Sequence, residues 1–192
     1  MTVDGLKFVA SVPPFIDQKP MNYLLRICLS LCILLCAATL AKAEQASLYD
    51  SSKARPLTPE EAVRFGPDSG KYRYDNRMIR AAMIAQSRAR SHSTSRCWRY
   101  VKTALLAAGV VNTYPKTAYA KQAAQELPRD YGFRKLRCRD PLRAPMGSVL
   151  VYGGADAGHV EIRTPRGYTS DFTSPRPYLK RPLVGIYVKP QA

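Results

Sequence analysis

Cys97 and His159 are the residues of this chain whose types and positions best fit a nucleophile and its base. Cys97 begins a helical pattern in which it shares one face with Val101 and Leu105. The backbone N–H groups and the dipole at a helix start favour a thiolate, and a thiolate beside a base is an activated nucleophile. His159 begins a predicted strand after a glycine-rich turn. We therefore predict a cysteine–histidine site.

The turn after the His159 strand determines which acid the imidazole meets. Residues 164–167, Thr-Pro-Arg-Gly, fit a three-residue hairpin loop that pairs Thr164 with Tyr168. In this register Glu161 and Asp171 share one face with His159, and Asp171 lies diagonally from it, about 7 Å away along the backbone. Asp171 is then the predicted orienter of the imidazole.

A slip of this register by one residue would change the assignment. Asp171 would move to the opposite face of the sheet, and Glu161 would become the orienter. The hairpin register is therefore the geometric assumption on which the third site residue depends.

Structural interpretations of the same residues remain open. Cys97 also fits a small core residue, or one half of a disulfide with Cys138 in an oxidising compartment. His92 lies in a serine-rich turn and is expected to be solvated or to cap a helix. Trp98 adjoins the cysteine and fits either the wall of a substrate cleft or the core. Trp98 and Glu161 are the candidate substrate-binding residues.

The N-terminal part of the chain predicts export. Arg26 precedes an apolar run at residues 27–40, and the small residues around Ala43 suit a cleavage site, which is typical of a secretory signal peptide. The run has roughly 14 residues, whereas about 20 are needed to span a membrane. We expect residues 1–43 to be this signal peptide, with Met21 as an alternative start.

The net charge of the chain and the distribution of its basic residues limit the kinds of molecule that it can be expected to bind. The chain has a formal net charge of +16, and most of it lies after residue 43. Outside the cytoplasm such a charge favours anionic polymers of the cell envelope. The basic residues are scattered and no nucleic-acid motif is present, so we expect a periplasmic or secreted monomer that binds peptidoglycan or another anionic envelope polymer, without nucleic acid or stable membrane insertion. Residues 44–57 are expected to form a flexible leader and residues 58–192 a single domain.

The hydrophobic period changes from helical to strand-like along this domain. Helices are predicted at 59–64, 75–89, 97–108 and 117–127, the last stopped by Pro128, and strands at 133–138, 148–152, 159–164, 168–172 and 183–188. Helices followed by a meander of strands indicate an α+β fold with the helices packed on one side of an antiparallel sheet.

The order of these parts resembles the papain-like cell-wall hydrolases, namely the NlpC-type peptidases and the CHAP amidases. The resemblance rests on the helix-start Cys97, the Pro-Met-Gly-Ser sequence at 145–148 and the Gly-His-Val sequence at 158–160. It implies a papain-like fold with N-terminal helices on a small antiparallel β-sheet, and hydrolysis of peptidoglycan amide bonds without a metal or cofactor. It also implies that Cys97 is the nucleophile, His159 the acid–base group and Asp171 the orienter.

Two other functions remain open at this point. A non-catalytic envelope-binding module on the same fold is favoured by Arg96 and Trp98, which flank Cys97 where the family commonly has other residues. A cysteine enzyme that acts on a different amide, such as a transglutaminase-like or effector activity, is the third possibility.

Overall fold

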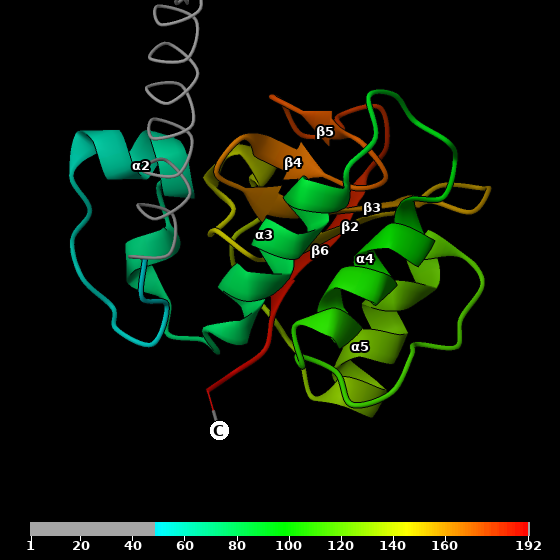
Figure 1. Ribbon diagram of the computed structural model, residues 1–192, viewed down its shortest axis with the longest axis horizontal. Coiled ribbons are helices and arrows are strands. Elements are labelled where there is room, and N and C mark those ends of the chain that lie inside the picture. The colour runs from blue at the N-terminus through cyan, green and yellow to red at the C-terminus, as the bar shows by residue number, and fades with distance from the viewer. Residues whose placement is uncertain (1–48, 192) are drawn as a thin grey trace, which may run out of the picture. The chain divides into compact units, whose positions relative to one another are not determined.

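The computed structural model describes residues 49–191 (Figure 1). The chain divides into two compact units, Met1–Ala43 and Glu44–Ala192, and all described residues belong to the second. The predicted signal peptide, the alternative start at Met21 and residues 44–48 of the expected leader lie outside the described residues.

Within the segment expected to be a flexible leader, residues 49–52 are buried or half-buried on the domain, whereas residues 53–56 are exposed. The Tyr49 side chain is 3% exposed, its ring lies 4.9 Å from the ring of Phe65, and its hydroxyl donates to the Ser69 carbonyl at 2.5 Å. Ser51 is also buried and donates to the Tyr74 carbonyl. A buried aromatic ring and a buried hydroxyl with a partner hold this segment on the domain.

Four α-helices precede the sheet within the described residues. They are α2 (Pro59–Phe65), α3 (Arg77–Arg88), α4 (Cys97–Ala107) and α5 (Ala123–Tyr131), with short 3-10 turns at Ser69–Lys71, Ala120–Gln122 and Pro141–Arg143. The capping signature before α2 forms as the sequence predicts, because the Thr58 and Glu61 side chains each accept from the other's backbone N–H. None of the described helices is long and apolar enough to cross a membrane.

The helix predicted at 117–127 is displaced along the chain. In its place lie a 3-10 turn and then α5, which continues through Pro128 to Tyr131. Gly132 caps this helix with a left-handed φ of 66°. A proline removes only one N–H donor from the helix. The turn persists because Leu127 and Tyr131 on either side of it are buried in the core.

The strands form one six-stranded antiparallel sheet, which confirms the α+β class. Its spatial order is β1-β6-β2-β3-β4-β5, built from β1 (Arg134–Lys135), β2 (Val149–Tyr152), β3 (His159–Thr164), β4 (Gly167–Thr169), β5 (Thr173–Ser174) and β6 (Leu183–Val188). Helices α3 and α4 contact β3 and lie in front of the sheet in Figure 1. The start of α4 and the start of β3 are therefore brought to the same region.

The register of the β3–β4 hairpin differs by one residue from the prediction. Thr164 pairs with Gly167 and Arg163 with Tyr168, so that the loop has two residues rather than three. Gly167 lies in the strand, and a Cβ built on it would stand 2.2 Å from the Ser174 carbonyl oxygen. The glycine is required both by the close approach of β5 and by its φ of 125°, a conformation that residues with side chains rarely adopt.

Candidate active site

Cys97 is the first residue of α4 and is half-buried. The residue before it, Arg96, is the N-cap and makes no side-chain capping hydrogen bond. The N–H groups of a first helical turn have no partner within the helix, and they carry the positive end of its dipole. A negative charge on the sulfur, or on an oxygen bound near it, is therefore favoured at this position.

The imidazole of His159 is the partner of that thiol. His159 begins β3 in register with Tyr152, and its side chain is 12% exposed. Its interaction with Cys97 favours the charged form of the ring. On its other side, the Nε2 atom lies 3.6 Å from Oε2 of Glu161, and the Tyr178 ring covers the imidazole with 4.4 Å between ring centroids.

The two partners of His159 decide its charge. Burial alone lowers the pKa of the imidazole, but the interactions with Cys97 and Glu161 outweigh it and raise the pKa of His159 from 6.5 to about 9. The imidazolium is therefore the favoured form at neutral pH.

Glu161 is held behind the imidazole by two hydrogen bonds. Its side chain is 4% exposed, and its Oε1 atom accepts from the Tyr152 hydroxyl at 2.7 Å and from the Tyr178 backbone N–H at 3.1 Å. Burial and the charge of Glu161 raise the pKa of Tyr152, so its hydroxyl remains a donor. These bonds leave Oε2 facing the histidine.

Asp171 does not lie against His159 as the sequence predicted, because the strand expected at 168–172 ends at Thr169 and the chain turns there into β5, so that Asp171 lies in the turn and not in a strand paired with β3. Its carboxylate is fully buried and faces the loop before α4. The Oδ2 atom accepts from the Thr94 N–H at 2.5 Å, the Thr94 hydroxyl at 2.9 Å and the Arg96 N–H at 3.1 Å. Burial by itself would raise the pKa of Asp171, but these hydrogen-bond donors together have the larger effect and hold the pKa below its ordinary value. The group is therefore held as a carboxylate.

The loop that Asp171 holds leads directly into Cys97 at the start of α4. Its residue Ser95 has a φ of 58° and is the one described residue other than glycine with a positive φ. On the other side of the loop, the Arg90 N–H donates to the Asp171 carbonyl at 2.8 Å. Asp171 thus fixes both ends of the turn that delivers Cys97, and the cost of the left-handed Ser95 is offset by these bonds.

Trp98 packs in the core and does not line a cleft. Its side chain is 3% exposed, and its indole N–H donates to the Thr117 hydroxyl at 3.1 Å. The Lys102 ammonium lies 5.1 Å from the ring centroid. The substrate-binding role predicted for Trp98 is therefore corrected in favour of packing, since no face of the ring is open to a ligand.

The other cysteine and histidine lie apart from this cluster. Cys97 and Cys138 are both free thiols, so the alternative of a disulfide is not realised. The Cys138 thiol donates to the Asp140 carbonyl at 3.4 Å, and burial raises its pKa. His92 is exposed beside Ser91. No group of His, Cys, Asp and Glu within residues 49–191 is arranged to hold a metal ion.

Two tyrosines complete the site and were missed by the sequence reasoning. Tyr152 has a signal in the sequence, since it precedes the turn opposite His159 and a short hairpin places the two side by side. Tyr178 has none, because it lies in a long connection before β6 and reaches the imidazole only through the tertiary fold.

The fold and the site together define an α+β domain with a cysteine, a histidine and a glutamate aligned at the meeting point of a helix start and a strand start. No protein-family model and no curated protein matches the chain. The chain is similar to crystal structures of the type VI effector–immunity complex Tae3–Tai3 from Ralstonia pickettii. The native complex shows 25% identity and a TM-score of 0.48 over 59% of this chain and 98% of that chain. The selenomethionine complex shows 25% identity and a TM-score of 0.44 over 56% and 97%.

Proposed function

We propose that this protein is an exported cysteine hydrolase that cleaves amide bonds in peptidoglycan peptides. The observation that carries the proposal is the alignment of Cys97, His159 and Glu161, in which the imidazole lies between a helix-start thiol and a buried carboxylate. A nucleophile, a base and a group that orients the base are the parts required for acyl transfer.

The reaction follows from this alignment. Glu161 faces Nε2, which leaves Nδ1 of His159 to serve the thiol. The Cys97 thiolate attacks the amide carbonyl carbon, and the C–N bond breaks as the imidazolium gives its proton to the leaving amine. Water then attacks the thioester while the neutral imidazole takes its proton, and the carboxylic acid product leaves with Cys97 restored as a thiolate beside the imidazolium.

The remaining groups prepare the site for these steps. The Cys97 N–H at the start of α4 is one donor to the oxyanion that develops on the carbonyl oxygen. Glu161 replaces Asp171 as the orienter of His159. Asp171 is instead a positioning residue, which holds the turn at Thr94 and Arg96 so that the thiol meets the imidazole.

Peptidoglycan as the substrate is supported by three independent features. The sequence pattern at residues 1–43 predicts export, the order of motifs resembles wall hydrolases, and the formal charge of +16 favours anionic envelope polymers. The bond is an amide of a stem or cross-linking peptide. Its position in the peptide distinguishes an endopeptidase from an amidase.

The test compares residues 44–192 with the same segment carrying Cys97→Ala on purified peptidoglycan sacculi. We expect the unsubstituted protein to release fragments whose masses identify the bond, and the variant to release none. If both proteins bind sacculi and neither releases a fragment from several wall chemistries, the non-catalytic binding module becomes the better description. Cleavage that persists in the variant would refute the role of Cys97.

A further inference from the structure

A basic groove follows the β1 edge of the sheet, apart from the cysteine site. We define it as two adjoining hollows that share Lys135, Leu136 and Arg137. One has a volume of about 610 Å³ and is closed by the start of β6. The other, of about 490 Å³, continues past Arg73 and Arg134. The cations that line the groove are Lys71, Arg73, Arg134, Lys135, Arg137 and Arg139.

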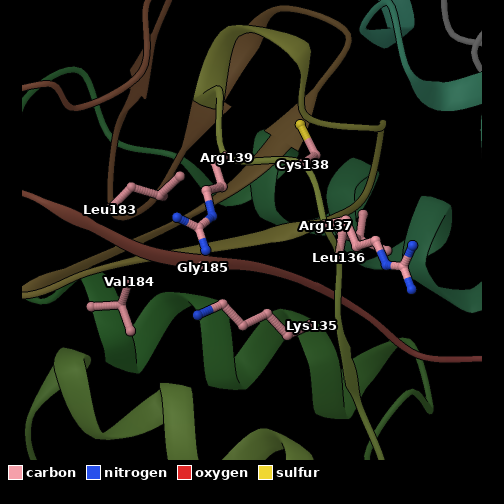
Figure 2. Close-up of a pocket in the computed structure, with 8 residues that line it drawn as sticks. All are labelled: Lys135, Leu136, Arg137, Cys138, Arg139, Leu183, Val184 and Gly185. Carbon is pink, nitrogen blue, oxygen red and sulfur yellow. The ribbon is translucent and has the colours of Figure 1, made fainter.

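The side chains are arranged along the groove with alternating directions. In Figure 2, Lys135 and Arg139 extend toward the same space beside Gly185, whereas Arg137 extends to the other side. The absence of a side chain at Gly185 makes room for this approach, since a Cβ there would lie 2.6 Å from Cε of Lys135. The groove therefore presents positive charge at successive positions rather than at one point.

Five of these six cations make no ion pair within the described part of the chain. Among residues 49–191, Arg73, Arg134, Lys135, Arg137 and Arg139 make no ion pair, and the groove is lined by no carboxylate. Lys71 alone of the six is paired, with Asp68 at 2.8 Å. Exposed like charges this close repel one another, so an anionic ligand would relieve an unfavourable arrangement.

A second copy of the chain does not supply that anion. Of the carboxylates in the described residues, all but Glu60 and Asp140 either face a cation of their own chain or are buried. Two scattered carboxylates do not form a surface that matches a row of cations. The ligand is therefore a different molecule with repeated negative groups.

The floor of the groove favours a polymer with apolar stretches between its charges. Leu136, Leu183 and Val184 lie between the cations in the larger hollow. Leu183 also connects the groove with the site, because it pairs with Tyr152, which in turn pairs with His159. Two strand spacings of the sheet, about 10 Å, separate the backbone at Leu183 from that at His159.

We propose that the basic groove binds a linear wall polymer with spaced negative groups and holds it beside the cysteine site. The negative groups are the free carboxylates of peptidoglycan peptides. The choice of a wall polymer rests on the proposed function, whereas the groove and its charge do not. Binding through the groove concentrates the enzyme on its substrate without adding a contact to the scissile bond.

The test measures binding without cleavage, in residues 44–192 carrying Cys97→Ala. The groove variant adds Arg134→Gln, Arg137→Gln and Arg139→Gln, all at exposed positions. A control variant removes the same charge elsewhere through Arg80→Gln, Lys116→Gln and Arg166→Gln, also exposed and without ion pairs within the described part of the chain. The polymers are sacculi stripped of phosphate polymers and, separately, soluble polyglycerol phosphate.

We expect the groove variant to bind stripped sacculi roughly tenfold more weakly at low salt, and with a smaller salt dependence, while the control stays within about twofold. Equal weakening in both variants, no binding to stripped sacculi, or a preference for polyglycerol phosphate overturns the proposal. If the unsubstituted protein fails to cleave sacculi, that result counts against the proposed function and not against the groove, because the binding assay uses the inactive Cys97→Ala protein.

A second measurement avoids substitution in the groove. Cys138 lines the larger hollow and is the single thiol of residues 44–192 once Cys97 is alanine. Polymer that occupies the groove should slow the alkylation of Cys138 several-fold. Unchanged alkylation at a polymer concentration that saturates binding would place the polymer elsewhere and overturn the proposal.

Discussion

Replacing Glu161 with glutamine tests most directly whether the Glu161 carboxylate stabilises the charged His159 imidazole. The glutamine has nearly the same shape, and its carbonyl oxygen can still accept from the Tyr152 hydroxyl and the Tyr178 N–H. The substitution therefore removes the negative charge that lies 3.6 Å from His159 Nε2 and leaves the packing in place. We expect the imidazolium to become less stable.

The magnitude follows from the pKa of His159. A rise from 6.5 to about 9 corresponds to roughly 3 kcal/mol in favour of the protonated form, shared between Cys97 and Glu161. A single charge at this distance in a buried site is worth about 2 kcal/mol after desolvation, so Glu161→Gln should lower the pKa of His159 to roughly 7.5. Because the folded pKa is raised, this stabilisation is complete below the ordinary pKa and is lost as the pH rises toward 9.

The assay is NMR titration of the two histidine rings, with exposed His92 as the internal reference. The alkaline limit of peptidoglycan cleavage should move in parallel, from near pH 9 to near pH 7.5. A matched control is Tyr152→Phe, which removes one hydrogen bond to Glu161 and keeps the charge, so the pKa should stay near its original value.

An unchanged titration of His159 in Glu161→Gln would refute the assignment of Glu161 as the group behind the imidazole. A shift of similar size in Tyr152→Phe would show that hydrogen bonding, and not charge, determines the pKa. Either result would require a different third residue in the proposed mechanism.

Three further variants test the neighbouring parts of the structure. Cys97→Ala should lower the pKa of His159 in the NMR titration, because the thiol is one of the groups that raise it. Asp171→Asn should slow Cys97 alkylation and lower the free energy of unfolding by about 2 kcal/mol in chemical denaturation. His159 should still titrate near pH 9 in this variant, because the contacts of Asp171 lie in the loop before α4. Gly167→Ala should destabilise the domain by more than about 2 kcal/mol in the same assay, because its Cβ would collide with the backbone of β5.

Controls separate these effects from general damage. Cys138→Ser should leave the pKa of His159 unchanged in the NMR titration, because Cys138 lines the basic groove and does not contribute to that pKa. If Asp171→Asn shifts the His159 titration as strongly as Glu161→Gln does, Asp171 acts on the base and the positioning role is wrong. If Gly167→Ala unfolds at the original denaturant concentration, the close approach of β5 does not require glycine.

Local patterns were sufficient for α3, α4, β2, β3 and β6 and for two of the three aligned residues, whereas the strand predicted at 168–172 is divided between β4 and β5. The apolar spacing after Cys97 predicts α4 to within one residue of its observed end, and alternation predicts the strand that begins at His159 with its observed bounds. Both patterns reflect interactions between residues close in sequence, namely helical periodicity and the two faces of a strand. Pro128 shows the limit of this reasoning, since burial of its neighbours kept it inside α5.

The third residue was decided by tertiary structure. The loop Thr-Pro-Arg-Gly at 164–167 permits hairpins of two or three residues, and sequence reasoning chose the wrong one. The chain also turns back after Thr169 into β5, whose close approach to Gly167 leaves no room for a side chain there. Asp171 lies in that turn and faces the loop at Thr94, so that Glu161 is the acid that remains beside the imidazole. The sequence by itself thus predicted the pairing of Cys97 with His159, because each begins an element that its local pattern defines, and only the tertiary structure decided which acid lies beside the imidazole.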